Sequence, residues 1–166
     1  IAADIVLTQL FEAKSLGSVL SSTKQFKQLG TDDQISLLWC IYTETESSIV
    51  PIVQEKARLQ LAKAPIDQIK QLPHAEQLQV MRDLVNQVNT PIGRSYGVLS
   101  VNTKLSFWHV LVDLMQQQIK CPISDHLQIS TTAKHVLAAI KKLNCSQQIT
   151  LLRNAVVDMG VDSLAS

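Results

Sequence analysis

Glycine, proline and aromatic residues are scarce in this chain of 166 residues: it has five glycines and five prolines, and aromatic side chains make up 4% of it. So few helix breakers permit long helices. Charge is also sparse, at 17%, and the 15 basic and 14 acidic residues leave a net charge of +1. Because the basic residues are spread along the chain, we expect neither a nucleic-acid surface nor an anionic-membrane surface.

Cysteine is equally rare, and its placement excludes two kinds of site. Cys40, Cys121 and Cys145 are odd in number and form no C-x-x-C pair, so we expect neither a disulfide framework nor a zinc site. No apolar run reaches the roughly 18 residues of a membrane-spanning helix, and the first residues, IAADIVLTQL, are not a basic leader. These absences predict a soluble, cytoplasmic protein that does not span the membrane and binds no metal.

Motifs of catalysis are missing as well. The sequence has no G-x-S-x-G elbow, no H-E-x-x-H pair and no glycine-rich phosphate loop. The acidic pair Asp32 and Asp33 fits a helix N-terminus, and Glu44 and Glu46 fall on different helix faces. We therefore expect a binding protein and not an enzyme.

The chain does contain a series of apolar repeats with helical spacing. Apolar residues recur at intervals of three and four, and no stretch alternates as a half-buried strand does. The pattern predicts an all-α protein. The expected helices cover residues 4–13, 19–29, 32–47, 52–62, 65–72, 73–88, 94–99, 102–119, 131–143 and 146–160.

Polar residues at several expected helix starts can satisfy the free backbone amides there. Thr31 and Gln34 have the spacing of a capping box. Asn144 has the same spacing to Gln147, ahead of the last helix. The other candidates are Ser130, Thr131 and Ser146 as caps and Gly160 as the stop of the last helix.

Two of the middle helices carry apolar stripes that include large aromatic rings. Two interpretations remain open: the rings fill the gap between helix bundles, or they line a long apolar slot together with the adaptable Met81 and Met115. The stripes are Ile35, Leu38, Trp39 and Tyr42 in one helix and Leu105, Trp108, Val112 and Met115 in the other.

The last expected helix carries a charge in an unusual place. Arg153 falls at the border of the apolar stripe, on a face shared with Thr150 and Asn154. Either the arginine extends its charge to water from a packed terminal helix, or this face is functional. The stripe consists of Ile149, Leu152, Val156 and Met159.

Six motifs are specific enough to compare with known families. They are FKQL from Phe26, DQ from Asp33, Trp39 with Tyr42, TPIxRxY from Thr90, NxKLxFW from Asn102, and QQITxLRNAVVDMG from Gln147 to Gly160. Together they resemble the N-terminal, carotenoid-binding domain of the cyanobacterial orange carotenoid protein, and most closely the stand-alone helical carotenoid proteins. The resemblance covers nearly the whole chain and is weakest over residues 1–25.

The resemblance implies a fold and a ligand. The fold is two interleaved four-helix bundles with a ligand tunnel between them, formed by residues 1–160, with residues 161–166 as a tail. The ligand is a keto-carotenoid, canthaxanthin or echinenone, held without a covalent bond. His109 and Leu127 stand where the family has aromatic residues and are assigned to the tunnel ends. The carotenoid-binding residues implied are Ile35, Leu38, Trp39, Tyr42, Met81, Leu105, Trp108, His109, Val112, Met115, Ile123, Leu127, Thr150 and Arg153.

The resemblance also implies partners and a role. Arg153 and Asn154 would contact the core of the phycobilisome, the antenna complex whose excess energy the carotenoid dissipates. The implied function is photoprotection, by antenna quenching or singlet-oxygen quenching, in the cytoplasm near thylakoid-attached phycobilisomes. The alternative is a carrier that passes its pigment to a homologue of the family's C-terminal domain.

Overall fold

The structure is a computed structural model that describes residues 17–44, 56–118 and 129–162. Within these ranges all regular structure is helical and there is no strand, which confirms the all-α class. The expected helix 4–13 and the expected contact residues Ile123 and Leu127 lie outside the described residues. The helices are residues 17–28, α2 (Thr31–Glu44), α4 (Lys56–Lys70), α5 (His74–Val85), α6 (Pro91–Gly97), α7 (Val101–Gln118), α9 (Thr131–Lys141) and α10 (Cys145–Val157).

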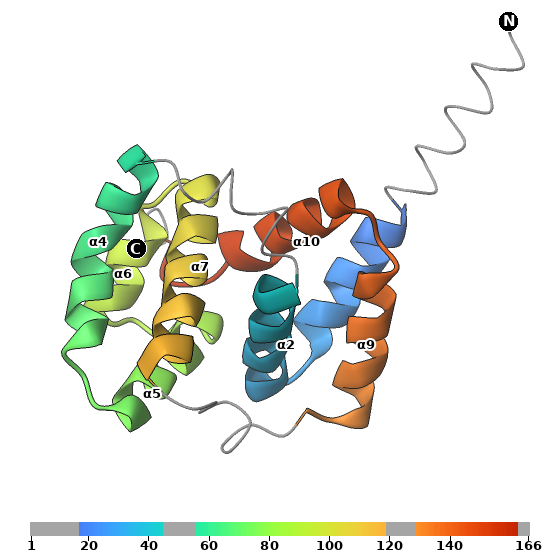
Figure 1. The fold of residues 1–166 in the computed structure, drawn as a ribbon, viewed down its shortest axis with the longest axis horizontal. Helices are drawn as coiled ribbons and strands as arrows, with labels where there is room; N and C mark the ends of the chain where they lie inside the picture. Colours follow the sequence, from blue (N-terminus) through green and yellow to red (C-terminus); the bar gives the residue numbers. More distant parts are fainter. Residues whose placement is uncertain (1–16, 45–55, 119–128, 163–166) are drawn as a thin grey trace, which may run out of the picture.

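The helices form two groups that share one core. Helices α4, α5, α6 and α7 lie on one side, and helix 17–28, α2 and α9 on the other (Figure 1). Helix α10 begins beside helix 17–28 and α9 and packs on α7, while α2 packs on α5, α7 and α9. Each group therefore contacts helices of the other, as two interleaved bundles do. The largest fully buried side chains include Trp108, Tyr96, Phe26 and Phe107.

Local cap signals predict the two C-terminal helices well. The Ser130 hydroxyl accepts a hydrogen bond from the Ala133 amide at the start of α9. Asn144 and Gln147 form the expected capping box, with both reciprocal bonds at 2.9 Å. Here the signal and the structure are only three residues apart in sequence, so tertiary packing has little influence on them.

The capping box expected at Thr31 is wrong. Thr31 is already inside α2, and its hydroxyl donates to Asn86 Oδ1 at 2.7 Å. The Gln34 amide instead donates to the carbonyl oxygens of Leu29 and Lys27, at 2.9 and 3.3 Å. Gln34 thus satisfies carbonyls at the end of the preceding helix, which have no partner within that helix.

The break expected at Pro65 is also wrong, because α4 runs through this residue. A proline inside a helix costs about 3 kcal/mol, since it removes one backbone hydrogen bond. Here Pro65 is buried, and Ala62, Ile66 and Ile69 bury one face of α4, which packs along α7. Apolar burial along the helix offsets the lost bond.

The last helix ends earlier than expected, before Gly160. Helix α10 ends at Val157, and Gly160 follows in a left-handed turn with φ of 75°. The Gly160 amide donates to the Leu84 carbonyl at 2.8 Å, and the Val161 amide donates to the Gly93 carbonyl at 3.0 Å. The glycine therefore turns the chain onto α5 and α6. The boundary between a domain 1–160 and a tail 161–166 stays a prediction.

Helix α6 starts three residues before the expected position, at Pro91. The Thr90 hydroxyl accepts a hydrogen bond from the Gly93 amide at 2.9 Å, and Pro91 occupies the first helical position, where it loses no bond. The segment expected as a loop is thus the start of the helix.

Polar contacts join the two helix groups at the molecular surface. Arg82 of α5 forms a bidentate pair with Asp32 of α2, with N to O distances of 2.8 and 3.2 Å. This hydrogen bond raises the pKa of the Arg82 guanidinium, which therefore stays charged. Lys27 reaches Asp158 at 2.6 Å. The surface where α2 meets α5 and helix 17–28 meets the end of α10, with these contacts at its edge, is called the seam below.

Candidate ligand-binding site

The expected site residues of α2 lie on its buried face. Ile35, Leu38 and Tyr42 are almost fully buried, and Trp39 is half-buried and packs against the core. The Tyr42 hydroxyl donates to the Leu105 carbonyl at 3.0 Å, which ties α2 to α7. Burial raises the pKa of this hydroxyl well above its usual range, so it remains a donor at ordinary pH.

The facing helices contribute the remaining buried members. Leu105, Trp108 and Val112 of α7 and Met81 of α5 are each at most 4% exposed. They belong to the same apolar cluster as the buried α2 residues. Seven expected residues from both helix groups therefore lie in the hydrophobic core that the described helices share: Ile35, Leu38, Tyr42, Met81, Leu105, Trp108 and Val112.

Other expected residues lie at the edge of this cluster or outside what the structure describes. His109 is half-buried, and its ring centroid is 6.1 Å from that of Tyr42. The Thr150 hydroxyl donates to the Ser146 carbonyl of its own helix at 3.0 Å. The Met115 side chain, Ile123 and Leu127 lie outside the described parts.

Arg153 lies between α10 and α7. Its Nε donates to Asn102 Oδ1 at 2.9 Å, and both residues are half-buried. Asn154 is also half-buried, next to the exposed Val157. The arginine therefore lies at the border of the buried stripe, where the helical spacing placed it, and Asn102 orients it.

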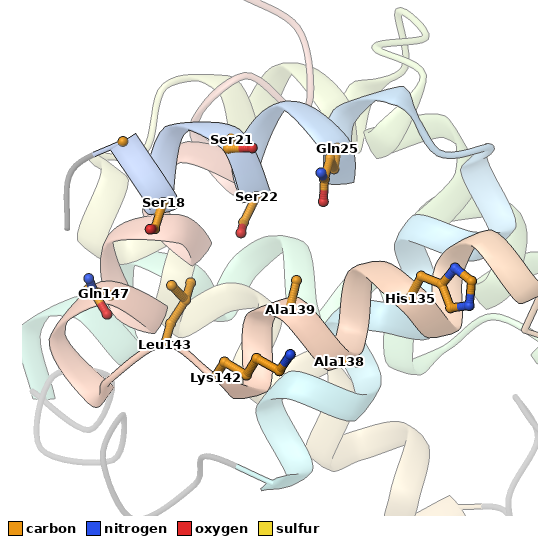
Figure 2. A pocket seen from close by; sticks show the side chains of 11 residues that line it. Ser18, Ser21, Ser22, Gln25, His135, Ala138, Ala139, Lys142, Leu143 and Gln147 are labelled. Atoms are coloured by element: carbon orange, nitrogen blue, oxygen red, sulfur yellow. The ribbon is translucent and has the colours of Figure 1, made fainter. Parts of the chain in front are cut away.

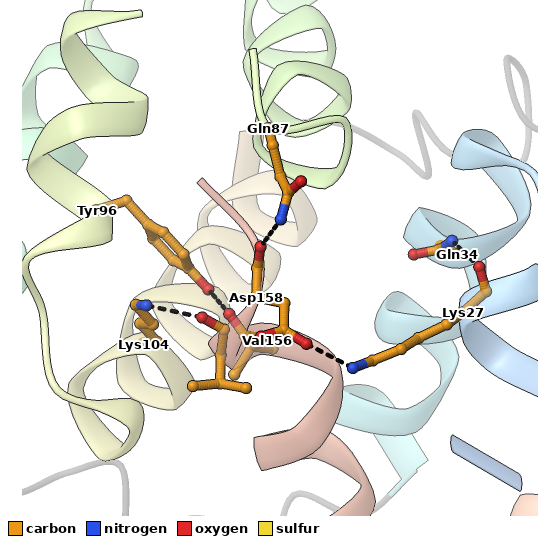
Figure 3. Close-up of polar contacts among 8 residues, drawn as sticks. Lys27, Gln34, Gln87, Tyr96, Lys104, Val156 and Asp158 are labelled. Carbon is orange, nitrogen blue, oxygen red and sulfur yellow. Dashed lines mark hydrogen bonds and ion pairs between the residues drawn. The ribbon is translucent and has the colours of Figure 1, made fainter. Parts of the chain in front are cut away.

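A buried polar cluster beside Trp108 was not assigned to the site from sequence. Trp108 Nε1 donates to the Tyr96 hydroxyl at 3.1 Å, and that hydroxyl donates to the Val156 carbonyl at 2.6 Å. Lys104 Nζ donates to the Val157 carbonyl at 2.9 Å and lies 5.2 Å from the Tyr96 ring centroid. Figure 3 shows Tyr96 and Lys104 reaching the end of α10 together, near the contact of Gln87 with the Asp158 carbonyl.

Burial acts on the two titratable members of this cluster in opposite directions. It raises the pKa of Tyr96 well above the usual range, so the hydroxyl keeps its proton. It lowers the pKa of Lys104, against the smaller opposing effects of Asp158 and Asp162. The sequence held a signal for both, since Tyr96 and Lys104 fall inside two of the recognised motifs. The sequence contained no signal, however, for the atoms that Tyr96 and Lys104 contact.

The structure has an open groove elsewhere, between helix 17–28 and α9. Its volume is about 710 Å³ (Figure 2). Serine and glutamine side chains of helix 17–28 face His135 and Lys142 across it. A smaller hollow of about 460 Å³ shares Gln25, His135 and Ala139 with it. None of the expected site residues lines either one, so this groove is distinct from the expected ligand site.

Two further kinds of site can be checked on the described part of the chain. It contains no group of three or more His, Cys, Asp or Glu side chains placed to hold a metal ion. No helix among the described residues is long and apolar enough to cross a membrane.

Comparisons with known proteins add an independent observation. A family model described as "Orange carotenoid protein, N-terminal" matches residues 12–162. An orange carotenoid-binding domain-containing protein of Nostoc sp. is 48% identical over 164 residues, which are 99% of this chain and 96% of that protein.

Two solved structures are similar over most of this chain. The Red Carotenoid Protein of Anabaena (Nostoc) sp., solved with canthaxanthin, is 32% identical with a TM-score of 0.73, over 86% of this chain and 98% of that one. The orange carotenoid protein of the same organism, also solved with canthaxanthin, is 41% identical with a TM-score of 0.78 over 87% of this chain. This chain covers 46% of that protein, about half its length.

Proposed function

Because the chain belongs to the orange carotenoid protein N-terminal family, we propose that it binds a keto-carotenoid, without a covalent bond, between its two groups of helices. The observation that carries the proposal is that seven of the expected contact residues, from α2, α5 and α7, are buried in the core that the two helix groups share. The two similar structures, which hold canthaxanthin, support this keto-carotenoid as the ligand, with echinenone as the other candidate. The proposed binding domain is residues 1–160, with 161–166 as a tail.

The chemistry of the cluster fits a polyene. A polyene has no hydrogen-bonding atoms along its length, so dispersion and burial, at about 25 cal/mol per Å², must supply most of the affinity. The polar atoms of Tyr42 and Trp108 already bond to protein atoms. These rings therefore offer only apolar surface to a ligand, and no buried polar atom of theirs would lose a partner when it binds.

We place the protein in photoprotection, near thylakoid-attached phycobilisomes in the cytoplasm. The bound polyene would accept excess excitation energy or quench singlet oxygen. The role of the chain is to hold the pigment and exclude water from it, which is a binding role and not catalysis. The alternative is a carrier that delivers the pigment to a C-terminal-domain homologue.

Expression in a host that makes keto-carotenoids tests pigment binding directly. We expect a coloured protein whose visible band is red-shifted relative to the extracted pigment, since an apolar, ordered environment fixes the polyene conformation. Extraction and chromatography identify the carotenoid. A colourless, folded product from a pigment-making host would contradict the proposal. Mixing the coloured protein with an apo C-terminal-domain homologue separates the alternatives, because only a carrier transfers its pigment.

We also propose that Arg153 and Asn154 contact the phycobilisome core. Their half-buried place at the α10 border, with Arg153 held by Asn102, supports a pre-oriented cation at the surface. Arg153→Leu should then leave the visible spectrum nearly unchanged. It should reduce quenching of phycobilisome fluorescence at least tenfold, because the loss of about one charge-assisted contact weakens binding by that factor. Arg94→Leu is the matched control, because Arg94 is an exposed arginine of α6. Equal quenching by both variants would refute the contact.

A further inference from the structure

A single hydrogen bond, from the Trp108 indole N–H to the Tyr96 hydroxyl, sets the orientation of the Trp108 ring. The indole is fully buried, and a buried N–H without a partner is costly. An indole N–H can only donate, so the Tyr96 hydroxyl accepts this bond and gives its own proton to the Val156 carbonyl. The chain of donors runs in one direction, from Trp108 through Tyr96 to the last turn of α10.

Tyr96 itself is held on several sides, so it can act as a fixed reference for Trp108. Its ring meets Phe107 edge to face, with centroids 5.0 Å apart, and Phe107 meets Trp108 in the same manner at 6.2 Å. A Cβ added to Gly160 would lie 2.5 Å from Tyr96 Cδ1, so the backbone of residue 160 packs directly on the ring. These contacts come from α7 and from the segment after α10, which leaves the tyrosine little freedom.

We infer that Tyr96 is a positioning residue for the pigment: by engaging the Trp108 N–H, it fixes which face of the indole the carotenoid meets. This inference rests on the proposed function. It also excludes one mode of recognition, since an N–H bonded to Tyr96 cannot donate to a keto oxygen. Trp108 then contributes a flat apolar surface of fixed orientation, and the specificity for an end ring comes from shape.

Tyr96→Phe removes the hydroxyl and keeps the ring, so it tests the inference without emptying the core. In the loaded protein we expect a shifted visible band and pigment release to lipid vesicles about fivefold faster, because the free indole N–H allows the ring to turn. In the pigment-free protein, made in a Trp39→Phe background so that Trp108 is the only indole, we expect a changed fluorescence maximum and near-UV circular dichroism.

Two controls separate positioning from general stability. Ser106→Ala removes another buried hydroxyl of α7, one that donates to the Asn102 carbonyl at 3.2 Å, and should change neither spectrum nor release. In a Trp108→Phe background, Tyr96→Phe should have no further effect on the spectrum, because the group it acts through is gone.

Each outcome decides the inference. A Tyr96→Phe protein that melts at a lower temperature but keeps the visible band, the release rate and the Trp108 signals would overturn it and leave pigment binding standing. Equal spectral shifts with and without Trp108 would overturn it as well. If the unmodified protein takes up no pigment, the proposed function is wrong, and so is the positioning role of Tyr96. This holds even if the fluorescence and circular dichroism of Trp108 change as expected in the pigment-free protein.

Discussion

Trp108→Ala should lower the free energy of unfolding of the pigment-free protein by about 4 kcal/mol, the usual cost of removing a fully buried aromatic side chain. The substitution opens a cavity in the core beside α7 and takes away the donor to the Tyr96 hydroxyl of α6. We also expect the purified protein to lose most of its pigment, because the proposed site loses its largest buried surface. Urea unfolding measures the first effect and the ratio of pigment to protein the second.

The two effects can be told apart with a variant that destabilises the fold elsewhere. Phe26→Ala also removes a fully buried aromatic side chain and should lower the free energy of unfolding by about 3 kcal/mol. Phe26, however, lies on helix 17–28 and is not among the expected ligand contacts. This variant should keep its pigment under conditions where it is folded.

Trp39→Ala should lose pigment with a smaller change in stability, since Trp39 is half-buried. The neighbouring Cys40→Ala should lose little pigment. Equal retention in the Trp108, Trp39 and Cys40 variants would contradict the assignment.

Gly97→Ala should cost about 3 kcal/mol of stability, although the added group is a single methyl. A Cβ at this position would lie 1.7 Å from the Val161 carbonyl oxygen and 2.8 Å from its carbon. Backbone atoms cannot rotate away as a side chain does, so the segment after α10 must leave α6 and give up the bond between the Val161 amide and the Gly93 carbonyl.

Gly17→Ala is the matched control, because a Cβ there meets nothing within 4 Å. Its stability should be unchanged or slightly higher, since alanine favours helix more than glycine does. Thermal and urea unfolding of both variants give the comparison. If Gly97→Ala were as stable as the control, the close approach of residue 161 to α6 would be wrong.

Features that depend on neighbours in sequence could be predicted for this fold, and features that depend on distant partners could not. Ser130 and the pair of Asn144 and Gln147 cap helices at three-residue range, so their types and spacing suffice. Pro65 breaks the local rule because α7 lies against it, and no local signal records that. Thr31 pairs with Asn86, 55 residues away, so its apparent capping role was misleading.

The same distinction holds for the candidate site. Intervals of three and four residues predict that Ile35, Leu38 and Tyr42 share a face, and that face is buried. The spacing does not show that Trp39, on the same stripe, is only half-buried. Nor does it show that the Tyr96 hydroxyl joins Trp108 to the end of α10, because that contact requires three helices to be placed relative to one another.

The polar edge of the seam has a consequence for how the two helix groups respond to their surroundings. Asp32 with Arg82 and Lys27 with Asp158 are ion pairs whose side chains keep a third or more of their surface in water. Such pairs contribute about 0 to 1 kcal/mol each and weaken as salt is added, whereas apolar burial beneath them does not. Added salt should therefore weaken the contacts at this edge by up to about 1 kcal/mol each, while the apolar contacts beneath them keep the two helix groups together.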